Sequence, residues 1–206
     1  DRELTYDSSH KSDFENNIMH FGAATALLGG PLEDTYSRYL FDGLTKNALI
    51  SFDPNYRVDL WKNKVDIFKR KCQSFIEKSH LCKFSLEEAQ LLSGKEDVKE
   101  ACVVLHEMGT KIIVITLGSE GTWLSTKNFQ KTIPSIKVRP KDTTGAGDAF
   151  IGCLLQQIAK YSSIDELLAD ESILTNMVAR ANKAGAITTT NFGAIESLPT
   201  LQQLDS

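Results

Sequence analysis

The chain has 206 residues, of which 41% are hydrophobic and 24% are charged, so its composition is that of a soluble globular protein and excludes a disordered one. The net charge of −4 argues against the basic surface that duplex nucleic acid requires. No apolar run approaches the roughly 18 residues of a membrane-spanning helix, and no basic-then-apolar leader opens the chain. We therefore expect a cytoplasmic protein without nucleic-acid or membrane partners.

The cysteines show no metal-ligand spacing. They are far apart, each lies in an apolar pattern, and none forms a CxxC pair. They are Cys72, Cys82, Cys102 and Cys153. We expect buried free thiols in a reducing cytoplasm rather than a zinc site.

Short apolar runs that indicate buried strands alternate with segments of helical periodicity. Residues 1–17 are polar and indicate a loop or an edge segment, although Arg2–Tyr6 has strand-like character. The pattern then predicts strands at 18–21, 48–52, 81–84 and 111–117, followed by hairpin strands within 122–138. It predicts helices near 36–44 and 64–78, two short helices that end before Gly94 and Gly109, and further helices at 147–161, at 173–189 and from Pro199. This alternation predicts a single α/β domain over 1–206, with a mainly parallel sheet covered by helices on both faces.

The most informative stretch is DTTGAGDAF at residues 142–150. A glycine-flanked turn leads directly into an amphipathic helix, so the N–H groups of Gly145, Ala146 and Gly147 are expected to point outward at the helix start. Such N–H groups bind anions, and the glycines allow close approach of the anion to the backbone.

Asp148 lies in the same turn, where two interpretations are open. A helix start favours a negative charge, so Asp148 could simply be a capping residue. No Lys or Ser/Thr follows the glycines as in a P-loop, so a metal ion, ordinarily Mg²⁺, is needed to neutralise transferred phosphates. The carboxylate is then free to accept a proton from an attacking hydroxyl.

The stretch 142–150 resembles the C-terminal signature of the ribokinase-like (PfkB) carbohydrate kinases, and the chain is most similar to their fructokinase branch. The resemblance implies that Asp148 is the catalytic base and also contacts the substrate, and that Gly145, Ala146 and Gly147 form the anion hole. It also implies that ATP with Mg²⁺ is the phosphoryl donor. Asp142 and Thr144, together with Gly193, match positions that hold a monovalent cation, which we expect to be K⁺.

Two further stretches resemble nucleotide-binding segments of the family. The first is the strand-turn at 116–121, and the second is the NKAGA segment at 182–186. The residues implied are Thr116, Gly118, Ser119, Gly121, Asn182 and Gly185. A plain hairpin turn and a small-residue helix packed on its neighbour explain the two stretches equally well.

The DPNYR segment at 53–57 resembles the family's Asp-Pro-Asn-x-Arg segment and implies that Asp53, Asn55 and Arg57 contact the substrate. It follows a predicted strand, where α/β sheets bind ligands. Ser85-Leu86-Glu87-Glu88 aligns with a motif whose Glu orders water around Mg²⁺, which assigns that role to Glu88. The same four residues also form a capping box.

The resemblance covers about 18–204, but the Gly-Gly-rich sugar motif and the β lid of the family's N-terminal part are not found. Residues 1–17 could be the tail of that lid. We therefore expect an incomplete ribokinase-like fold with an apolar edge, which invites a homodimer or a separate N-terminal segment as partner.

The function expected is transfer of the γ-phosphoryl group of Mg-ATP to a sugar hydroxyl, with fructose preferred. Ribose, 2-keto-3-deoxygluconate and nucleosides are the alternative acceptors. A non-catalytic fragment that binds nucleotide or a partner is the alternative from another class. A dinucleotide-binding dehydrogenase is disfavoured because no GxGxxG follows the first strand.

Overall fold

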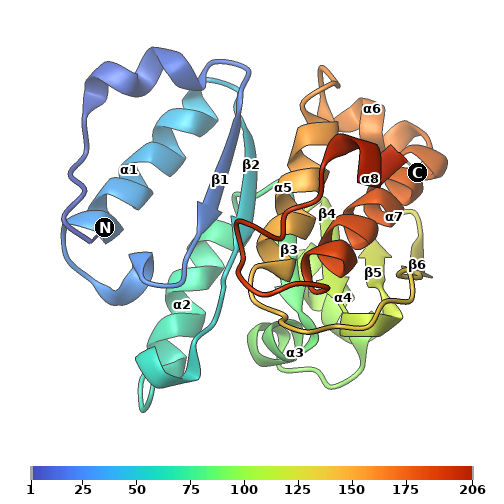
Figure 1. Ribbon diagram of the computed structural model, residues 1–206. Coiled ribbons are helices and arrows are strands. Elements are labelled where there is room, and N and C mark those ends of the chain that lie inside the picture. Colours follow the sequence, from blue (N-terminus) through green and yellow to red (C-terminus); the bar gives the residue numbers. More distant parts are fainter. Residues whose placement is uncertain (1, 206) are drawn as a thin grey trace. The chain divides into compact units, whose positions relative to one another are not determined.

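The computed structural model describes residues 2–205, and they form two compact units (Figure 1). The first unit ends at Val114 and the second begins at Ile115, so the division falls inside strand β4 (Ile112–Thr116). The expectation of one domain over the whole chain stays a prediction, and each unit is described by itself.

The first unit is an α/β layer built on parallel strands. β1 (Ile18–Gly22) pairs in parallel with β2 (Leu49–Asp53), and β2 pairs in parallel with β3 (Leu81–Ser85). The helices between and after these strands are α1 (Pro31–Thr45), α2 (Val65–Ile76), α3 (Leu86–Ser93) and α4 (Val98–Met108). Figure 1 shows α1 lying beside β1 and β2. The predicted parallel pairing and helical segments are confirmed in this unit.

The core of the first unit contains a cluster of aromatic rings. Phe75 of α2 lies with its ring centroid 5.2 Å from that of Phe52 in β2 and 5.6 Å from that of Phe21 in β1. Farther along α2, Phe68 packs against Trp61, and both side chains are fully buried. Burial of each such ring stabilises the unit by about 1.5–3 kcal/mol. The helical stripe that predicted α2 is thus the surface that holds it on the sheet.

The thiols follow the expected pattern with one difference. All four cysteines are free; Cys72, Cys82 and Cys102 are buried, and Cys153 is half-buried. Burial raises the pKa of the Cys82 thiol to about 12, so this thiol stays protonated at neutral pH.

Among residues 2–205, no helix combines the length and the apolar character needed to cross a bilayer.

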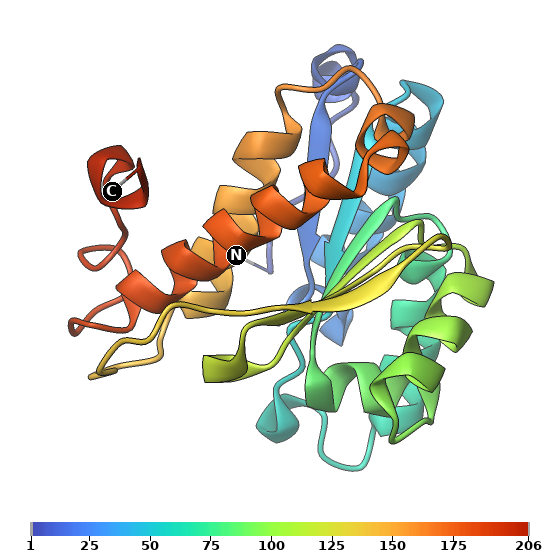
Figure 2. The same cartoon turned by 90° about the vertical axis from the view of Figure 1, so that its right-hand side faces the viewer.

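The described part of the second unit contains a hairpin followed by α-helices. β5 (Thr122–Ser125) and β6 (Gln130–Ile133) pair antiparallel, as the sequence predicted. The helices are α5 (Ala146–Ile158), α6 (Ile164–Ala169), α7 (Glu171–Thr188) and α8 (Leu201–Asp205). Figure 2 shows α5 and α7, both orange, packed against each other. The short α6 was not predicted, although Ser163 and Glu166 carry its capping signal: the Ser163 hydroxyl accepts from the Glu166 N–H at 3.3 Å.

Arg2–Tyr6 forms no strand, so the loop alternative is confirmed for it and the expectation from its strand-like character is wrong. The segment is held by side chains instead: Thr35 of α1 donates to the Leu4 carbonyl at 3.0 Å. A 3-10 helix, η1 (Ser8–Phe14), follows. That residues 1–17 are the tail of a lid stays a prediction.

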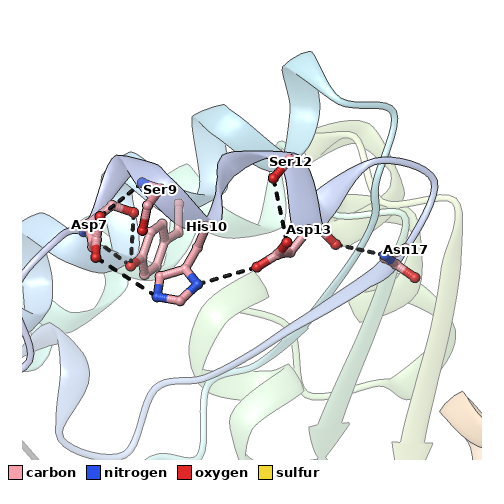
Figure 3. A network of polar contacts seen from close by, with 7 residues as sticks. Asp7, Ser9, His10, Ser12, Asp13 and Asn17 are labelled. Carbon is pink, nitrogen blue, oxygen red and sulfur yellow. Dashed lines mark hydrogen bonds and ion pairs between the residues drawn. The ribbon is translucent and has the colours of Figure 1, made fainter.

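A polar network stabilises η1 (Figure 3). The Asp7 carboxylate caps the helix by accepting from the Ser9 N–H at 2.8 Å. His10 lies between two carboxylates, with Nδ1 3.3 Å from Asp13 and Nε2 4.0 Å from Asp7. Asn17 donates to the Asp13 carbonyl at 2.6 Å. The network is exposed, and it reaches α1 through Tyr39, whose hydroxyl accepts from the Asp7 N–H at 3.2 Å.

Asp42 of α1 anchors the segment. Its carboxylate lies 2.7 Å from the Lys11 ammonium and accepts from the Tyr6 hydroxyl at 2.6 Å. Lys11 first, and then Tyr6, hold the pKa of Asp42 below its ordinary value. One nearly buried carboxylate therefore ties the N-terminal segment to the first helix.

Asp42→Asn is expected to release residues 6–14, because the amide keeps the shape and loses the charge. Amide hydrogen exchange of this segment should become faster, while β1 and β2 keep their protection. In the wild type the stabilisation from Asp42 is complete above its ordinary pKa of 3.8 and is lost as pH falls through the lowered folded value. The variant should lack this acid step.

Asp34→Asn is the matched control, since Asp34 lies on the same helix but pairs with Arg38 at the surface. Equal exchange of residues 6–14 in the wild type and Asp42→Asn would contradict the anchoring role.

Candidate functional site

The start of α5 is a turn that only glycine can make. Gly145 is the N-cap residue with φ of 79°, in the left-handed region. A Cβ at this position would lie 2.7 Å from the Cβ of Ala194, well inside van der Waals contact. Ahead of it, the Asp142 carboxylate accepts from the Thr144 N–H at 2.9 Å and shapes the turn.

Three backbone N–H groups were expected to be free at this turn, and two of them are. Within residues 2–205, the N–H groups of Gly145 and Gly147 donate to no carbonyl or side chain. The Ala146 N–H, by contrast, donates to the Thr143 carbonyl at 3.3 Å. The expectation of three free donors is therefore corrected to two, because the turn that starts the helix uses the middle one.

Asp148 projects from the first turn of α5 and is exposed. Its carboxylate forms no hydrogen bond or ion pair with any residue of the described chain, and α5 has no side-chain cap. Asp148 therefore makes no capping hydrogen bond, but it is the acidic residue of the first turn, where a helix start favours a negative charge, so both interpretations stay open. An uncommitted carboxylate beside two uncommitted donors can accept a proton while the donors hold an anion.

The loop after α7 closes over this turn within the second unit. Gly193 donates its N–H to Asp142 Oδ2 at 3.3 Å, and the Lys141 N–H donates to the Thr189 carbonyl at 2.7 Å. Hydrogen bonds from Thr144 and then Gly193 hold the pKa of Asp142 below its ordinary value. The three residues predicted to hold a monovalent cation, Asp142, Thr144 and Gly193, thus lie together.

The predicted nucleotide residues of α7 have structural contacts. The Asn182 side chain accepts from the Thr122 hydroxyl at 2.6 Å and donates to the Ile133 carbonyl at 2.9 Å, which links α7 to both hairpin strands. A Cβ at Gly185 would lie 3.0 Å from the Ala146 carbonyl, so Gly185 lets α7 approach the start of α5. The small-residue packing interpretation is confirmed, and contact of either residue with nucleotide stays a prediction.

The turn at 116–121 contains two glycines with different roles: Gly121 is required by packing, and Gly118 is not. A Cβ at Gly121 would lie 2.1 Å from the Ile133 carbonyl oxygen, so this glycine is needed for packing. Gly118 also has positive φ, of 60°, but no atom would meet a Cβ there. Ser119 is exposed in the short 3-10 turn that begins at Gly118, and Thr116 ends β4. Nucleotide contact by these residues stays a prediction.

The predicted sugar residues lie in the first unit, at the carboxyl end of β2. Asp53 is buried and forms an ion pair of 2.7 Å with Lys83 of β3, whose side chain is 10% exposed. The other Asp53 oxygen accepts from the Asn55 N–H at 3.1 Å, and Arg57 is exposed. The structure brings Asp53 and Asn55 together and adds Lys83, which the sequence analysis missed. The sequence did hold a signal for this pair: Lys83 lies within an otherwise apolar strand, and the preceding strand in the sequence ends in Asp53.

Glu88 is buried and bonded on both carboxylate oxygens. One accepts from the Ser85 N–H at 2.8 Å, which completes the predicted capping box, and the other accepts from the Tyr56 N–H at 2.6 Å. Burial raises the pKa of Glu88, and the Asp53 carboxylate raises it further. The capping box is confirmed; ordering of water around Mg²⁺ stays a prediction. In the part of the chain described, no three His, Cys, Asp or Glu side chains gather into a metal cluster.

Comparison with known proteins gives a consistent result. A model of the pfkB family of carbohydrate kinases matches residues 9–201. Fructokinase-1 of Zea mays is 37% identical over 184 residues, which are 89% of this chain and 55% of that protein. This chain therefore spans little more than half the length of such relatives.

Solved structures agree. A fructokinase from Vibrio cholerae O395, crystallised with fructose, ADP and a calcium ion, matches with a TM-score of 0.81 and 28% identity, over 92% of this chain and 60% of that one. Aminoimidazole riboside kinase from Salmonella enterica matches with a TM-score of 0.81 and 27% identity, over 95% and 65%. The likeness confirms the expected ribokinase-like α/β fold.

Gly145→Ala is expected to destabilise the second unit by about 1–3 kcal/mol, because the new Cβ requires a strained backbone and collides with Ala194. Thermal unfolding measures the loss. The double variant Gly145→Ala/Ala194→Gly should recover the steric part and leave the backbone strain. A single variant as stable as the wild type would show that the turn is less constrained than described.

Lys83→Met is expected to destabilise the first unit by about 3–5 kcal/mol, because it leaves Asp53 buried and unpaired. Lys62→Met is the matched control: its ion pair with Asp59 has the same distance, 2.7 Å, but the two side chains are 67% and 87% exposed. Loss of an exposed pair costs at most about 1 kcal/mol. Equal losses in urea unfolding would show that burial does not set the strength of the pair.

Proposed function

Because this chain belongs to the pfkB family of carbohydrate kinases, we propose that it carries the phosphoryl-transfer machinery of an ATP-dependent sugar kinase, with fructose as the preferred acceptor. The observation that carries the proposal is the start of α5. An exposed carboxylate without partners, Asp148, lies in the same helical turn as the uncommitted N–H groups of Gly145 and Gly147.

In this proposal the sugar hydroxyl attacks the γ-phosphorus of ATP, and Asp148 accepts the hydroxyl proton. The Gly145 and Gly147 N–H groups donate to the oxygens of the transferring phosphoryl group as their charge develops. Ala146 takes part after its long bond to Thr143 opens. Loss of one such donor costs other enzymes about 2.7–4 kcal/mol of barrier, so two donors are a substantial part of the catalysis.

Mg²⁺ would supply the remaining charge neutralisation on the phosphates. The described residues offer no carboxylate cluster that would hold Mg²⁺ alone. Phosphate oxygens and water would therefore provide most of its ligands. Glu88 would act through water. Asp142, Thr144 and Gly193 lie together, which supports assigning K⁺ to them.

Fructose is preferred because the relatives over 89% of this chain are named fructokinases. In the proposal, Asp53, Asn55 and Arg57 contact the sugar. Ribose, 2-keto-3-deoxygluconate and nucleosides remain alternative acceptors, and a kinase of a riboside is among the similar structures. We assign the protein to the cytoplasm, where ATP and free sugars meet.

The test is ATP consumption by this chain with Mg²⁺ and K⁺, offered fructose, ribose or 2-keto-3-deoxygluconate in turn. Asp148→Asn should abolish sugar-dependent turnover, since the amide cannot accept the proton. It should keep ATP affinity and thermal stability, because the wild-type carboxylate bonds no other residue.

Near-normal turnover in Asp148→Asn would remove this residue from the mechanism. Absence of turnover with every sugar, in a folded sample that binds ATP, would favour a non-catalytic nucleotide-binding protein. Restoration of turnover by a relative's separately expressed N-terminal part would instead favour a site completed by a second segment.

A further inference from the structure

The loop that follows β2 is tied to neighbouring elements by buried charges. At its start, Asp53 bonds Lys83 of β3 through Oδ2 and the Asn55 N–H through Oδ1. Three residues on, the Tyr56 N–H donates to Glu88 Oε1 of α3 at 2.6 Å. Between and after these ties, Pro54 is buried, Asn55 is half-buried with a left-handed φ of 48°, and Arg57 is exposed.

Sheet register explains the first tie. β2 and β3 are parallel, with Phe52 opposite Cys82. The next residues along the two strands are Asp53 and Lys83, so their side chains emerge on the same side of the sheet. The ion pair between them therefore fixes the end of β2 at the point where the loop begins.

The second tie needs a carboxylate rather than any capping residue. A capping box uses one acceptor at its fourth position, which Gln supplies as well as Glu. Here Glu88 uses both oxygens as acceptors, one for Ser85 and one for Tyr56. A Gln side chain has one acceptor oxygen, so its NH₂ group would face one of the two N–H groups.

Stability alone does not account for these charges. Two carboxylates and one ammonium lie buried together, with Asp53 3%, Lys83 8% and Glu88 6% exposed. Apolar residues of similar volume are often as stabilising as a buried ion pair, so such pairs are best attested where they specify one geometry. The geometry specified here is the backbone of residues 53–57.

We propose that Lys83 and Glu88 are positioning residues for sugar binding: Lys83 holds Asp53, Glu88 holds Tyr56, and together they fix the loop that presents Asn55 and Arg57 to the acceptor sugar. The role in sugar binding rests on the proposed function. The fixing of the loop does not, and it is measured separately.

The loop is tested by trypsin under native conditions. Trypsin cleaves after Arg57, which is exposed in extended backbone with φ of −121° and ψ of 106°. Cleavage after Lys127, exposed in the turn between β5 and β6, is the internal reference. Lys83→Met and Glu88→Gln should speed cleavage after Arg57 by at least about tenfold relative to Lys127, because cleavage follows the population of the open loop. Lys95→Met, which removes an exposed pair with Glu100, should leave the ratio unchanged.

Kinetics tests the sugar role. In whichever form of the enzyme is active, Lys83→Met should raise the KM for sugar by about tenfold or more and leave the KM for ATP and kcat nearly unchanged, as lost ground-state binding requires. Lys83→Arg keeps the charge and should restore much of the sugar affinity.

Four outcomes decide the matter. Unchanged cleavage after Arg57 in folded variants overturns the proposal. Equal acceleration at Arg57 and Lys127 also overturns it, because the residues would then stabilise the chain generally. Selective cleavage with a raised KM for sugar supports it in full. Selective cleavage in a chain that neither binds nor phosphorylates any sugar supports the fixing of the loop and refutes the proposed function.

Discussion

The close approach of backbones at the start of α5 is the constraint on which the second unit depends. Gly145 leaves space for Ala194, and Gly185 leaves space for the Ala146 carbonyl. A side chain at either glycine would push a neighbouring segment away from the turn. Two N–H groups lack partners here because the start of a helix has no preceding helical carbonyls to accept them, so tight packing and an anion-binding site coincide at this turn.

The parts of the fold that depend on periodicity could be predicted from the sequence. The apolar runs placed β1 to β4, and the stripe from Phe68 to Ile76 placed α2, because burial of a continuous apolar surface decides both kinds of element. Arg2–Tyr6 was misjudged for the opposite reason. Its structure depends on partners distant in sequence, Thr35 and Asp42, that local β propensity does not report.

The candidate site divides in the same way. The turn at 142–148 could be predicted because glycine positions and the apolar face of a helix are local signals. The hydrogen bond from the Ala146 N–H to the Thr143 carbonyl could not be predicted, since it depends on the geometry of the turn. The partners of Asp53 and Glu88 were also hidden: Lys83 and the Tyr56 N–H are separated from them by 30 and 32 residues and are brought close by sheet register and by the packing of α3. Tertiary structure, rather than composition, turned a capping box into a link between α3 and the loop after β2.

The donors proposed to hold the phosphoryl group belong to the main chain, which gives the chain an unusual mutational profile. Nearly all substitutions at position 147 keep the N–H, and only proline removes it. A substitution at this position therefore acts through the path of the backbone and through the room that glycine leaves for an approaching anion. Residue 145 must stay a glycine for the path of the turn and residue 148 an aspartate for the proposed proton transfer. Substitutions elsewhere should inactivate mainly by bending the turn, including those in the distant segment around Ala194 that touches it.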